Sequence, residues 1–298
     1  MNLKYLEYAV VVNKTHSINK AATELMLSQP YLSGCLKSLE EEIGYPVFFR
    51  TPNGVHLTEK GTAFMRCAQN ILSEYEKMKL IADDGREHPL RLAAAPLSEI
   101  MRVFLEFKKN SAEKFQDTLT EYIYEGLYES IASGENRIGI VLKNSGSEPE
   151  MERLLDRYGL KSREIIPARP YYIAVSQQHP FAEKETVSLE ELTSHPMVCY
   201  QPPNLEEYLR WIGLPCLPPD SLLVCDRGQF FDAINSGGFY SVIIKWDKSI
   251  HKNLHYLPLT GSVTSASLHY VCRKDDKPDV REQRFLKYLV ENLSGISD

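Results

Sequence analysis

The chain has 298 residues, of which 43% are hydrophobic and 25% are charged, with 34 Lys and Arg against 40 Asp and Glu. This composition indicates a globular protein of two or three domains, and no run approaches the roughly 18 apolar residues of a membrane-spanning helix. The formal net charge of -6 excludes a general polyanion binder, so contact with nucleic acid has to be local. The first residues are too polar for a signal peptide, and we expect a cytoplasmic protein.

The first 58 residues read as short helices separated by turns. Ser17 caps a helix over residues 18–26, and Ser28 caps a further helix that Gly44 closes. A turn of only a few residues between these two helices is typical of a helix-turn-helix, whose second member enters the DNA major groove. The helix before them turns a set of apolar residues inward: Leu3, Leu6, Ala9, Val10 and Val11. After them, short apolar strands around Asn53-Gly54 predict a two-stranded wing.

The helix that begins at Ser28 has a glycine on its outer face. Its inner stripe consists of Leu32, Cys35, Leu36, Leu39 and Ile43. Gly34 lies almost opposite this stripe, where glycine costs roughly 1 kcal/mol relative to alanine. We interpret it as a position that lets the backbone approach bases or phosphates closely. The alternative is that the missing side chain simply deprives the helix of an interaction with DNA.

A long helix follows Thr58 and is expected to run to about Asp84. Its apolar residues recur at heptad spacing: Phe64, Ala68, Ile71, Tyr75, Met78 and Ala82. The stripe spans about 40 Å at 1.5 Å per residue, which is more than the small segment beside it can cover. We therefore favour a dimerisation helix over a helix that packs only on its own domain.

From Pro89 onward, predicted strands alternate with predicted helices, which indicates an α/β fold with a mainly parallel sheet. The first series covers residues 90–142 and the second covers residues 168–245. The strand over residues 267–273 and the helix over residues 282–293 could return to the first series. Two such lobes enclose a cleft, and ligands in these sheets bind beyond the carboxyl ends of the strands.

The stretch HSINKAATELMLSQPYLSGCLKSLEEEIGYPVFFRTPNGVHLTEKG resembles the winged helix-turn-helix of LysR-type transcriptional regulators. A weaker resemblance continues through PYYIAVSQQHPFAEKETVSLEEL and INSGGFYSVI. It implies a winged helix-turn-helix over residues 1–58, a linker helix over 59–88 and a two-lobed, periplasmic-binding-protein-like α/β effector domain over 89–298. Lobe I would comprise residues 89–164 and 266–298, and lobe II residues 165–265. The resemblance further implies a homodimer or homotetramer that binds double-stranded DNA under small-molecule control, with no enzymatic activity and no cofactor.

The chain departs from the family pattern at three places. Gly34 stands where many members carry a long polar or basic side chain, and residues 51–54 replace a basic wing tip. Arg137 occupies a position that is usually acidic in the strand RIGIVL. The resemblance therefore leaves DNA contacts and allosteric coupling to be worked out from this chain's own residues.

The candidates for DNA contact lie on the outer side of the helix that begins at Ser28 and on the wing. Gln can pair with adenine, Ser and Tyr can bond bases or phosphates, and Lys can reach guanine or phosphate. Acidic residues 40–42 would be repelled by DNA, so only the first two turns should enter the groove. Each candidate could instead be a solvated surface residue. They are Ser28, Gln29, Pro30, Tyr31, Ser33, Gly34, Lys37, Ser38, Arg50 and His56.

The candidates for effector binding follow the predicted strands. They are Pro96, Leu97, Ser98, Lys143, Asn144, Tyr200, Gln201, Asp226 and Arg227. Ser98 heads a helix whose free N–H groups can hold an anion, and the two cations would agree with a carboxylate. We expect a small anionic or zwitterionic metabolite. The alternative is a set of loop residues in water, with Asp226 simply paired with Arg227.

Other chemistry is less well supported by the residues. Six cysteines without a CxxC spacing favour reduced, mostly buried thiols. Cys216 and Cys225 resemble the peroxide-sensing branch of the family, but a proline-rich stretch and a strand position favour inert, buried thiols. His251 and His255, in an apparently irregular segment, lack a third metal ligand nearby. The rival function is a solute-binding or enzymatic protein whose N-terminal helices only oligomerise, and deletion of residues 1–58 would leave its activity intact.

Overall fold

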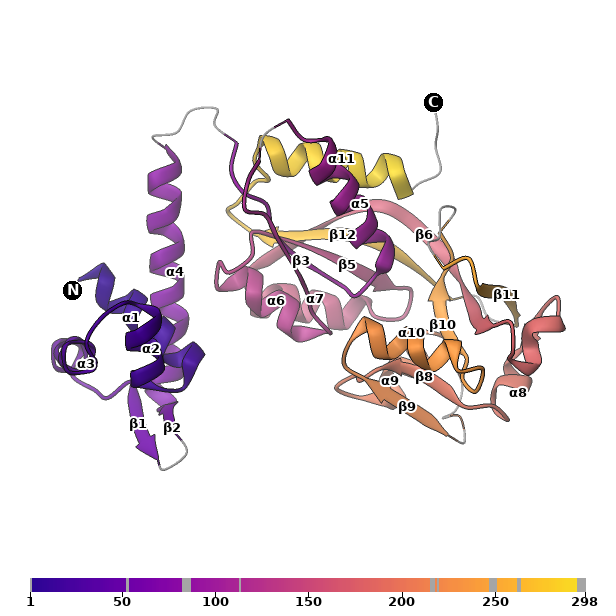
Figure 1. Cartoon of the computed structure of the whole chain (residues 1–298), viewed down its shortest axis with the longest axis horizontal. Coiled ribbons are helices and arrows are strands. Elements are labelled where there is room, and N and C mark those ends of the chain that lie inside the picture. Colours follow the sequence, from indigo (N-terminus) through magenta and orange to yellow (C-terminus); the bar gives the residue numbers. More distant parts are fainter. Residues whose placement is uncertain are drawn as a thin grey trace. The chain divides into compact units, whose positions relative to one another are not determined.

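The computed structural model describes residues 2–51, 54–81, 87–112, 114–214, 218, 220–246, 251–261 and 264–293. The chain divides into two compact units, Met1–Arg86 and Glu87–Asp298, and each is taken by itself (Figure 1). The wing-tip residues Pro52 and Asn53, the end of the predicted linker helix including Ala82, and Cys216 lie outside the described residues.

The first unit is a helix-turn-helix followed by a hairpin and a long helix. Its elements are α1 (Leu3–Thr15), α2 (Ile18–Glu24), α3 (Gln29–Ile43), β1 (Phe48–Thr51), β2 (Gly54–Leu57) and α4 (Glu59–Ile81). The predicted caps are confirmed, since Ser17 and Ser28 accept the N–H groups of Lys20 and Tyr31. Gly44 takes a φ of 82° after α3, a left-handed conformation that glycine adopts at low cost.

The core of the first unit lies between α1, α2, α3, the hairpin and the start of α4. The predicted inner stripe of α3 is buried from Leu32 to Leu39, while Ile43 is only partly buried. On α1, Val12 is buried, whereas Val10 and Val11 are only partly buried. At Gly61, a Cβ atom would lie 2.0 Å from the carbonyl oxygen of Val47, so only glycine allows α4 to approach the wing this closely.

The apolar stripe of α4 is divided between burial and exposure. Phe64 and Ala68 are buried in the core of the first unit, as the alternative of a helix packed on its own domain requires. Further along, Ile71 and Met78 are 39% and 66% exposed. The unit therefore covers only the beginning of the stripe.

The second unit is a mixed α/β structure. Its elements are β3 (Arg91–Ala94), α5 (Ser98–Asn110), β4 (Thr118–Glu121), α6 (Glu125–Ala132), β5 (Ile138–Asn144), α7 (Glu148–Arg157), β6 (Leu160–Ser176), η1 (Pro180–Glu183), β7 (Val187–Ser188), α8 (Leu189–Leu192), β8 (Met197–Tyr200), α9 (Leu205–Trp211), β9 (Ser221–Val224), α10 (Arg227–Asn235), β10 (Ser241–Ile244), β11 (Leu254–Thr260), β12 (Ser265–Arg273) and α11 (Val280–Leu293).

The main sheet has the strand order β4-β3-β5-β12-β6-β11-β7, and β10 also pairs with β6. The expectation of a mainly parallel sheet is wrong for this sheet. Strand β12 is antiparallel to both β5 and β6, and β10 and β11 are antiparallel to β6. The physical reason is that β11 and then β12 run back along the length of β6, from Ser176 to Leu160, and so return to lobe I antiparallel to it. The predicted return of the last strand and helix to the first series is thereby confirmed.

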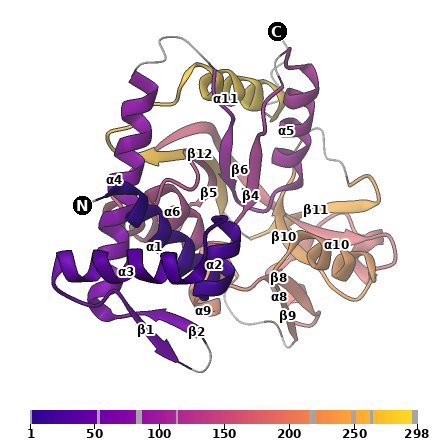
Figure 2. The ribbon, with the colours of Figure 1, turned by 60° about the vertical axis from the view of Figure 1, so that its left-hand side comes forward.

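Alternating side chains in lobe I pack two pairs of helices on opposite faces of the sheet. Leu92 and Ile140 share a cluster with Phe104 of α5 and Phe285 of α11. Ala93 and Val141, one residue further along their strands, instead pack with residues of α6 and α7. Figures 1 and 2 show α5 and α11 side by side over the strands. No helix among the described residues is long and apolar enough to cross a membrane.

Several elements of the second unit were not predicted from the sequence. Helix α7, the first half of β6 and strand β11 were not among the predicted elements, although Pro149 in the first turn of α7 and Gly159 after it are signals of a helix start and end. Strand β11 contains His255, so the segment that looked irregular is in part a strand. Arg137, which stands where the family usually has an acidic residue, forms an ion pair with a residue distant in the sequence. Its Nε lies 2.7 Å from Oε1 of the buried Glu282 on α11.

Candidate nucleic-acid interface and ligand cavity

Helix α3 presents an open edge to solvent. Pro30, Gly34, Lys37 and Ser38 are exposed along it, and Ser28 is exposed at its start. A Cβ atom built on Gly34 meets no atom within 4 Å, so nothing in this unit requires a glycine there. The middle of the exposed α3 edge thus carries no side chain at Gly34, and no neighbouring atom blocks access to the backbone there.

The wing flanks one side of this edge. Arg50, on β1, donates a hydrogen bond of 2.9 Å from its guanidinium to the hydroxyl of Ser33. Next to it, the Glu40 carboxylate accepts the backbone N–H groups of Val47 and Phe48, at 2.7 and 3.0 Å. Glu40 thus fixes the wing to the end of α3, a structural role that was not foreseen from the sequence. The half-buried Gln29 lies at the start of the same helix.

Aromatic side chains lie at the start of α3 and on the wing. Tyr31 is 53% exposed, and its hydrogen bond with Cys35 raises the pKa of its phenol. Tyr8 of α1 makes a smaller contribution to the same rise in pKa. On β2, His56 stacks with His16 at a centroid distance of 5.9 Å. On the open edge itself, the Lys37 ammonium lies 3.6 Å from the Glu41 carboxylate, so its charge is partly offset.

The second unit contains a cavity of about 470 Å³, a size typical of small-molecule sites. Its walls come from the ends of β3, β4 and β5, from α6 and α7, and from the segments around β8, α9, α10 and β10. Aromatic rings dominate the lining: Tyr122, Tyr124, Tyr128, Tyr171, Tyr200, Tyr208, Trp211, Phe230, Phe231, Trp246, His251 and Tyr256.

Five of the predicted effector residues line this cavity: Pro96, Leu97, Ser98, Asn144 and Tyr200. Their polar atoms already have partners. Ser98 Oγ lies 2.9 Å from Nε2 of His251, and the hydroxyl of Tyr200 donates to the carbonyl oxygen of Pro96 at 3.2 Å. The amide oxygen of Asn144 accepts a hydrogen bond from Tyr171. These contacts join the two lobes across the cavity.

The other four predicted effector residues, Lys143, Gln201, Asp226 and Arg227, are not among the lining residues. Lys143 lies between the lining residues Leu142 and Asn144 of β5 without being one of them. Asp226 caps α10 by accepting the N–H of Gln229 at 2.8 Å, and it does not serve as the partner of Arg227. Arg227 Nε instead lies 3.4 Å from Oε1 of Glu121. The cations that suggested an anionic ligand therefore lie outside the cavity wall.

The charged residues of the lining, within the part of the chain that the structure describes, are the carboxylates Glu99, Glu125, Glu150 and Glu207 and one arginine. The only Lys or Arg among the described lining residues is Arg153, which pairs with Glu150. A second lining carboxylate, Glu125, accepts from Arg157 at 2.7 Å and from the Tyr158 hydroxyl at 2.8 Å. Inside, burial raises the pKa of the Tyr128 phenol to about 12.

The aromatic wall was not predicted from the sequence. One signal was available, since YIYEGLY brings three tyrosines together directly after a predicted strand. His251 was considered only as a metal ligand, whereas it stacks on Phe231 at a centroid distance of 3.6 Å. Among the described residues, no group of three or more His, Cys, Asp or Glu could hold a metal ion.

The thiols differ from expectation at one position. Cys35, Cys199 and Cys272 are buried, and Cys67 is exposed. Cys225 is also exposed, because β9 ends one residue before it, so its predicted burial is wrong. Its thiol contacts Oε1 of Gln201 at 3.5 Å.

Comparison with known proteins identifies both units. Residues 3–62 match the model of the bacterial regulatory helix-turn-helix protein, lysR family. Residues 119–294 match the LysR substrate binding domain. BudR of Raoultella terrigena, an HTH-type transcriptional regulator, is 30% identical over 216 residues, covering 68% of this chain and 68% of that protein. Among the first curated relatives, the matched stretch spans 62% to 68% of their length.

Solved structures show the same fold. Full-length OxyR C199D from Pseudomonas aeruginosa covers 98% of this chain and 94% of its own, with 18% identity and a TM-score of 0.68. Full-length CbnR in complex with its target DNA covers 98% of this chain and 99% of its own, with 18% identity and a TM-score of 0.58. Together with the matches of both units, these findings show that the chain belongs to the LysR family of transcriptional regulators.

Proposed function

We propose that this protein is a DNA-binding transcriptional regulator in which a small molecule in the cavity of the second unit modulates DNA binding or activation. The observation that carries the proposal is the open edge of α3, which is the third helix of a helix-turn-helix unit that matches the family. DNA reading belongs to residues 1–58, linkage and oligomerisation to residues 59–88, and effector binding to residues 89–298. A regulator of chromosomal genes works where the DNA is, in the cytoplasm, and needs no catalytic activity.

In this proposal the first two turns of α3 enter the major groove. Lys37 reaches guanine or phosphate, and Gln29 reaches adenine. The free N–H groups at the start of the helix accept a phosphate, and Arg50 and His56 on the wing contact the backbone or the minor groove. The partly offset charge of Lys37 and the net charge of -6 favour a local contact over general attraction to DNA.

Oligomerisation follows from the uncovered stripe of α4. Two copies that pair along Ile71 and Met78 would place two α3 helices on half-sites about 34 Å apart, or a multiple of that distance. The solved CbnR complex, a fold relative bound to its target DNA, supports the same use of the first unit. A ligand would act by having different affinities for two arrangements of the subunits.

The experiment is selection of bound DNA from a random pool, followed by gel shifts on the selected site. We expect Lys37→Ala to weaken binding to the selected site by about 1 to 3 kcal/mol if it contacts a base. Glu41→Ala removes the acidic neighbour of Lys37 and should leave binding unchanged or stronger. Lys109→Ala, an exposed lysine on α5, is the matched control for loss of one positive charge.

Binding as in wild type by Lys37→Ala, Glu41→Ala and Lys109→Ala alike would contradict the placement of α3 in the groove. Failure to enrich any sequence from the pool would contradict the regulator function itself. The second outcome would favour the rival solute-binding or enzymatic protein, whose first unit only oligomerises. In that case the cavity would still bind its ligand in the absence of DNA.

A further inference from the structure

The cavity of the second unit is bounded by aromatic rings from both lobes, and this points to its ligand. Tyr124 meets Tyr208 edge to face, at a centroid distance of 6.2 Å and an angle of 86°. Tyr200 stacks on Phe230 at 4.7 Å. Rings in these arrangements offer flat faces and edges to a further ring. The surface available to a ligand is therefore largely apolar and shaped for aromatic contact.

Phenols and an imidazole in this wall are driven towards their uncharged form by burial. Burial raises the pKa values of the phenols of Tyr124 and Tyr208. Burial also lowers the pKa of His251, with a further contribution from Arg227. A site that penalises a phenolate and an imidazolium penalises a carboxylate or an ammonium on a ligand for the same reason.

For an anionic ligand, the described lining residues offer a single possible counter-ion. The lining cation Arg153 is paired with Glu150, and the lining carboxylate Glu125 is paired with Arg157. An anion would therefore compete for a guanidinium that is already engaged. A cation would meet the lining carboxylates Glu99, Glu125, Glu150 and Glu207, of which Glu125 and Glu150 already have arginine partners, and its main cost is the loss of its own hydration.

One buried donor in the wall lacks an acceptor. Trp246 is 3% exposed and lines the cavity, and its indole N–H has no hydrogen-bond partner among the described residues. Buried donors are rarely left unpaired, because they lose their bonds to water. A ligand oxygen that accepts this hydrogen bond would satisfy it.

We propose that the cavity takes an uncharged aromatic ligand with a hydrogen-bond acceptor that the Trp246 indole N–H reaches. This inference rests on the proposed function and replaces the anionic metabolite expected from Lys143 and Arg227. A cavity of about 470 Å³ has room for a ligand with two fused rings. The wall then holds the rings, and Trp246 sets their orientation.

The test compares three probes that share one ring system, with the full-length protein in calorimetry and in quenching of tryptophan fluorescence. They are 2-naphthamide, which is uncharged, 2-naphthoate, an anion, and 2-naphthylmethylammonium, a cation. We expect 2-naphthamide to bind at least about tenfold more tightly than either ion. Tighter binding of either ion, or no binding of 2-naphthamide, overturns the proposal.

Two substitutions of the same kind test the role of Trp246. Trp246→Phe keeps an apolar ring and removes the donor, and should weaken 2-naphthamide binding about two- to tenfold. Trp211→Phe is the matched control, because the partly exposed Trp211 also lines the cavity and can bond to water. Equal losses in the two variants would contradict the assigned hydrogen bond. An unfolded Trp246→Phe protein is recognised by its thermal transition, and the probe comparison in wild type then decides alone.

The DNA gel shift is measured separately, without probe, so that the two proposals fail independently. Preferred binding of 2-naphthoate with intact sequence-specific DNA binding would overturn the ligand class and leave the regulator in place. Preferred binding of 2-naphthamide by a protein that selects no DNA sequence would do the reverse.

Discussion

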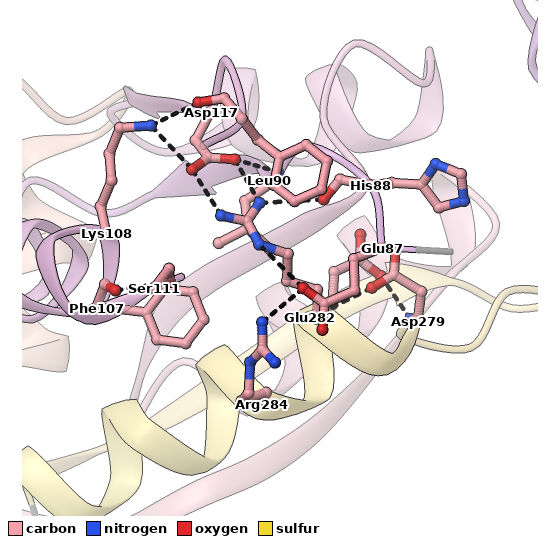
Figure 3. A network of polar contacts seen from close by, with 12 residues as sticks. Glu87, His88, Leu90, Phe107, Lys108, Ser111, Asp117, Asp279, Glu282 and Arg284 are labelled. Carbon is pink, nitrogen blue, oxygen red and sulfur yellow. Dashed lines mark hydrogen bonds and ion pairs between the residues drawn. The ribbon is translucent and has the colours of Figure 1, made fainter. Parts of the chain in front are cut away.

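Arg281 on α11 and Asp117, just before β4, form a two-pronged ion pair in which both side chains are fully buried. One guanidinium nitrogen donates to Oδ2 of Asp117 at 2.8 Å, and another donates to Oδ1 and to the carbonyl oxygen of His88. Asp117 also accepts the N–H of Leu90 and the ammonium of Lys108 (Figure 3). The pair thus ties the last helix to the strands where the second unit begins.

Breaking this pair should destabilise the second unit strongly. Arg281→Met leaves the Asp117 carboxylate buried without its main partner, which typically costs about 3 to 5 kcal/mol. Chemical denaturation of wild type and variant measures the free energy of unfolding. Lys274→Met removes the exposed ion pair with Asp156 and should cost less than about 1 kcal/mol. Equal losses of unfolding free energy in the two variants would show that the buried ion pair stabilises the unit no more than the exposed one.

The same pair predicts a loss of stability in acid. Burial opposes the charged form of Asp117, but the hydrogen bonds from Arg281 and Leu90 outweigh it and lower the pKa to about 2. The unfolded value is about 3.9, so the folded pKa is depressed, and the stabilisation is complete above about pH 4 and lost as pH falls towards 2.

This contribution is measured by comparison with Asp117→Asn, whose side chain does not titrate. The gap in unfolding free energy between wild type and variant should narrow by about 2 kcal/mol between about pH 5 and pH 2.5. A gap that stays constant over this range would mean that the carboxylate does not titrate in this way.

Sequence reasoning succeeded where the physics is local. The cap at Ser28 and the closing glycine at Gly44 depend on residues a few positions away, and both were predicted. The Arg137–Glu282 and Arg281–Asp117 pairs join residues 145 and 164 positions apart. Periodicity carries no information on such pairs, so the partner of Arg137 could not be predicted.

The cavity shows the same limit. Strand ends predicted that Ser98 and Asn144 would line it, and they do. Lys143 was predicted by the same rule, but the direction of a side chain depends on the exact register of the strand. Arg227 was predicted to bind the effector or to pair with Asp226, yet its ion pair is with Glu121 on β4, and only the folded chain brings these two together.

The stripe on α4 predicts an interface between two copies. Ile71 and Met78 are exposed in the single chain, and a lysine at either position would place a charge in an apolar seam. Met78→Lys should raise the dissociation constant of the dimer at least about tenfold, as measured by sedimentation equilibrium. Thr62→Lys, on the opposite side of α4, is the matched control. Unchanged association of Met78→Lys would mean that the copies pair elsewhere.

At Gly34, the residue that best stabilises the helix and the residue that best allows DNA binding are expected to differ. A Cβ atom at this position meets nothing within 4 Å, so Gly34→Ala should stabilise the first unit by about 1 kcal/mol through helix propensity alone. If the α3 backbone lies close to bases or phosphates, the same methyl group should weaken binding to the selected site about tenfold or more. Thermal denaturation and gel shifts measure the two effects.

The matched control is Gly126→Ala, a helical glycine on α6 whose Cβ atom would lie 3.4 Å from the ring of Tyr122. It should gain a similar amount of helix stability without changing DNA binding. If Gly34→Ala improves both stability and specific binding, the backbone does not approach the DNA closely, and the glycine only deprives α3 of a side chain that could read DNA. Higher stability together with weaker specific binding in Gly34→Ala would instead show that the glycine lowers helix stability but lets the α3 backbone lie close to DNA.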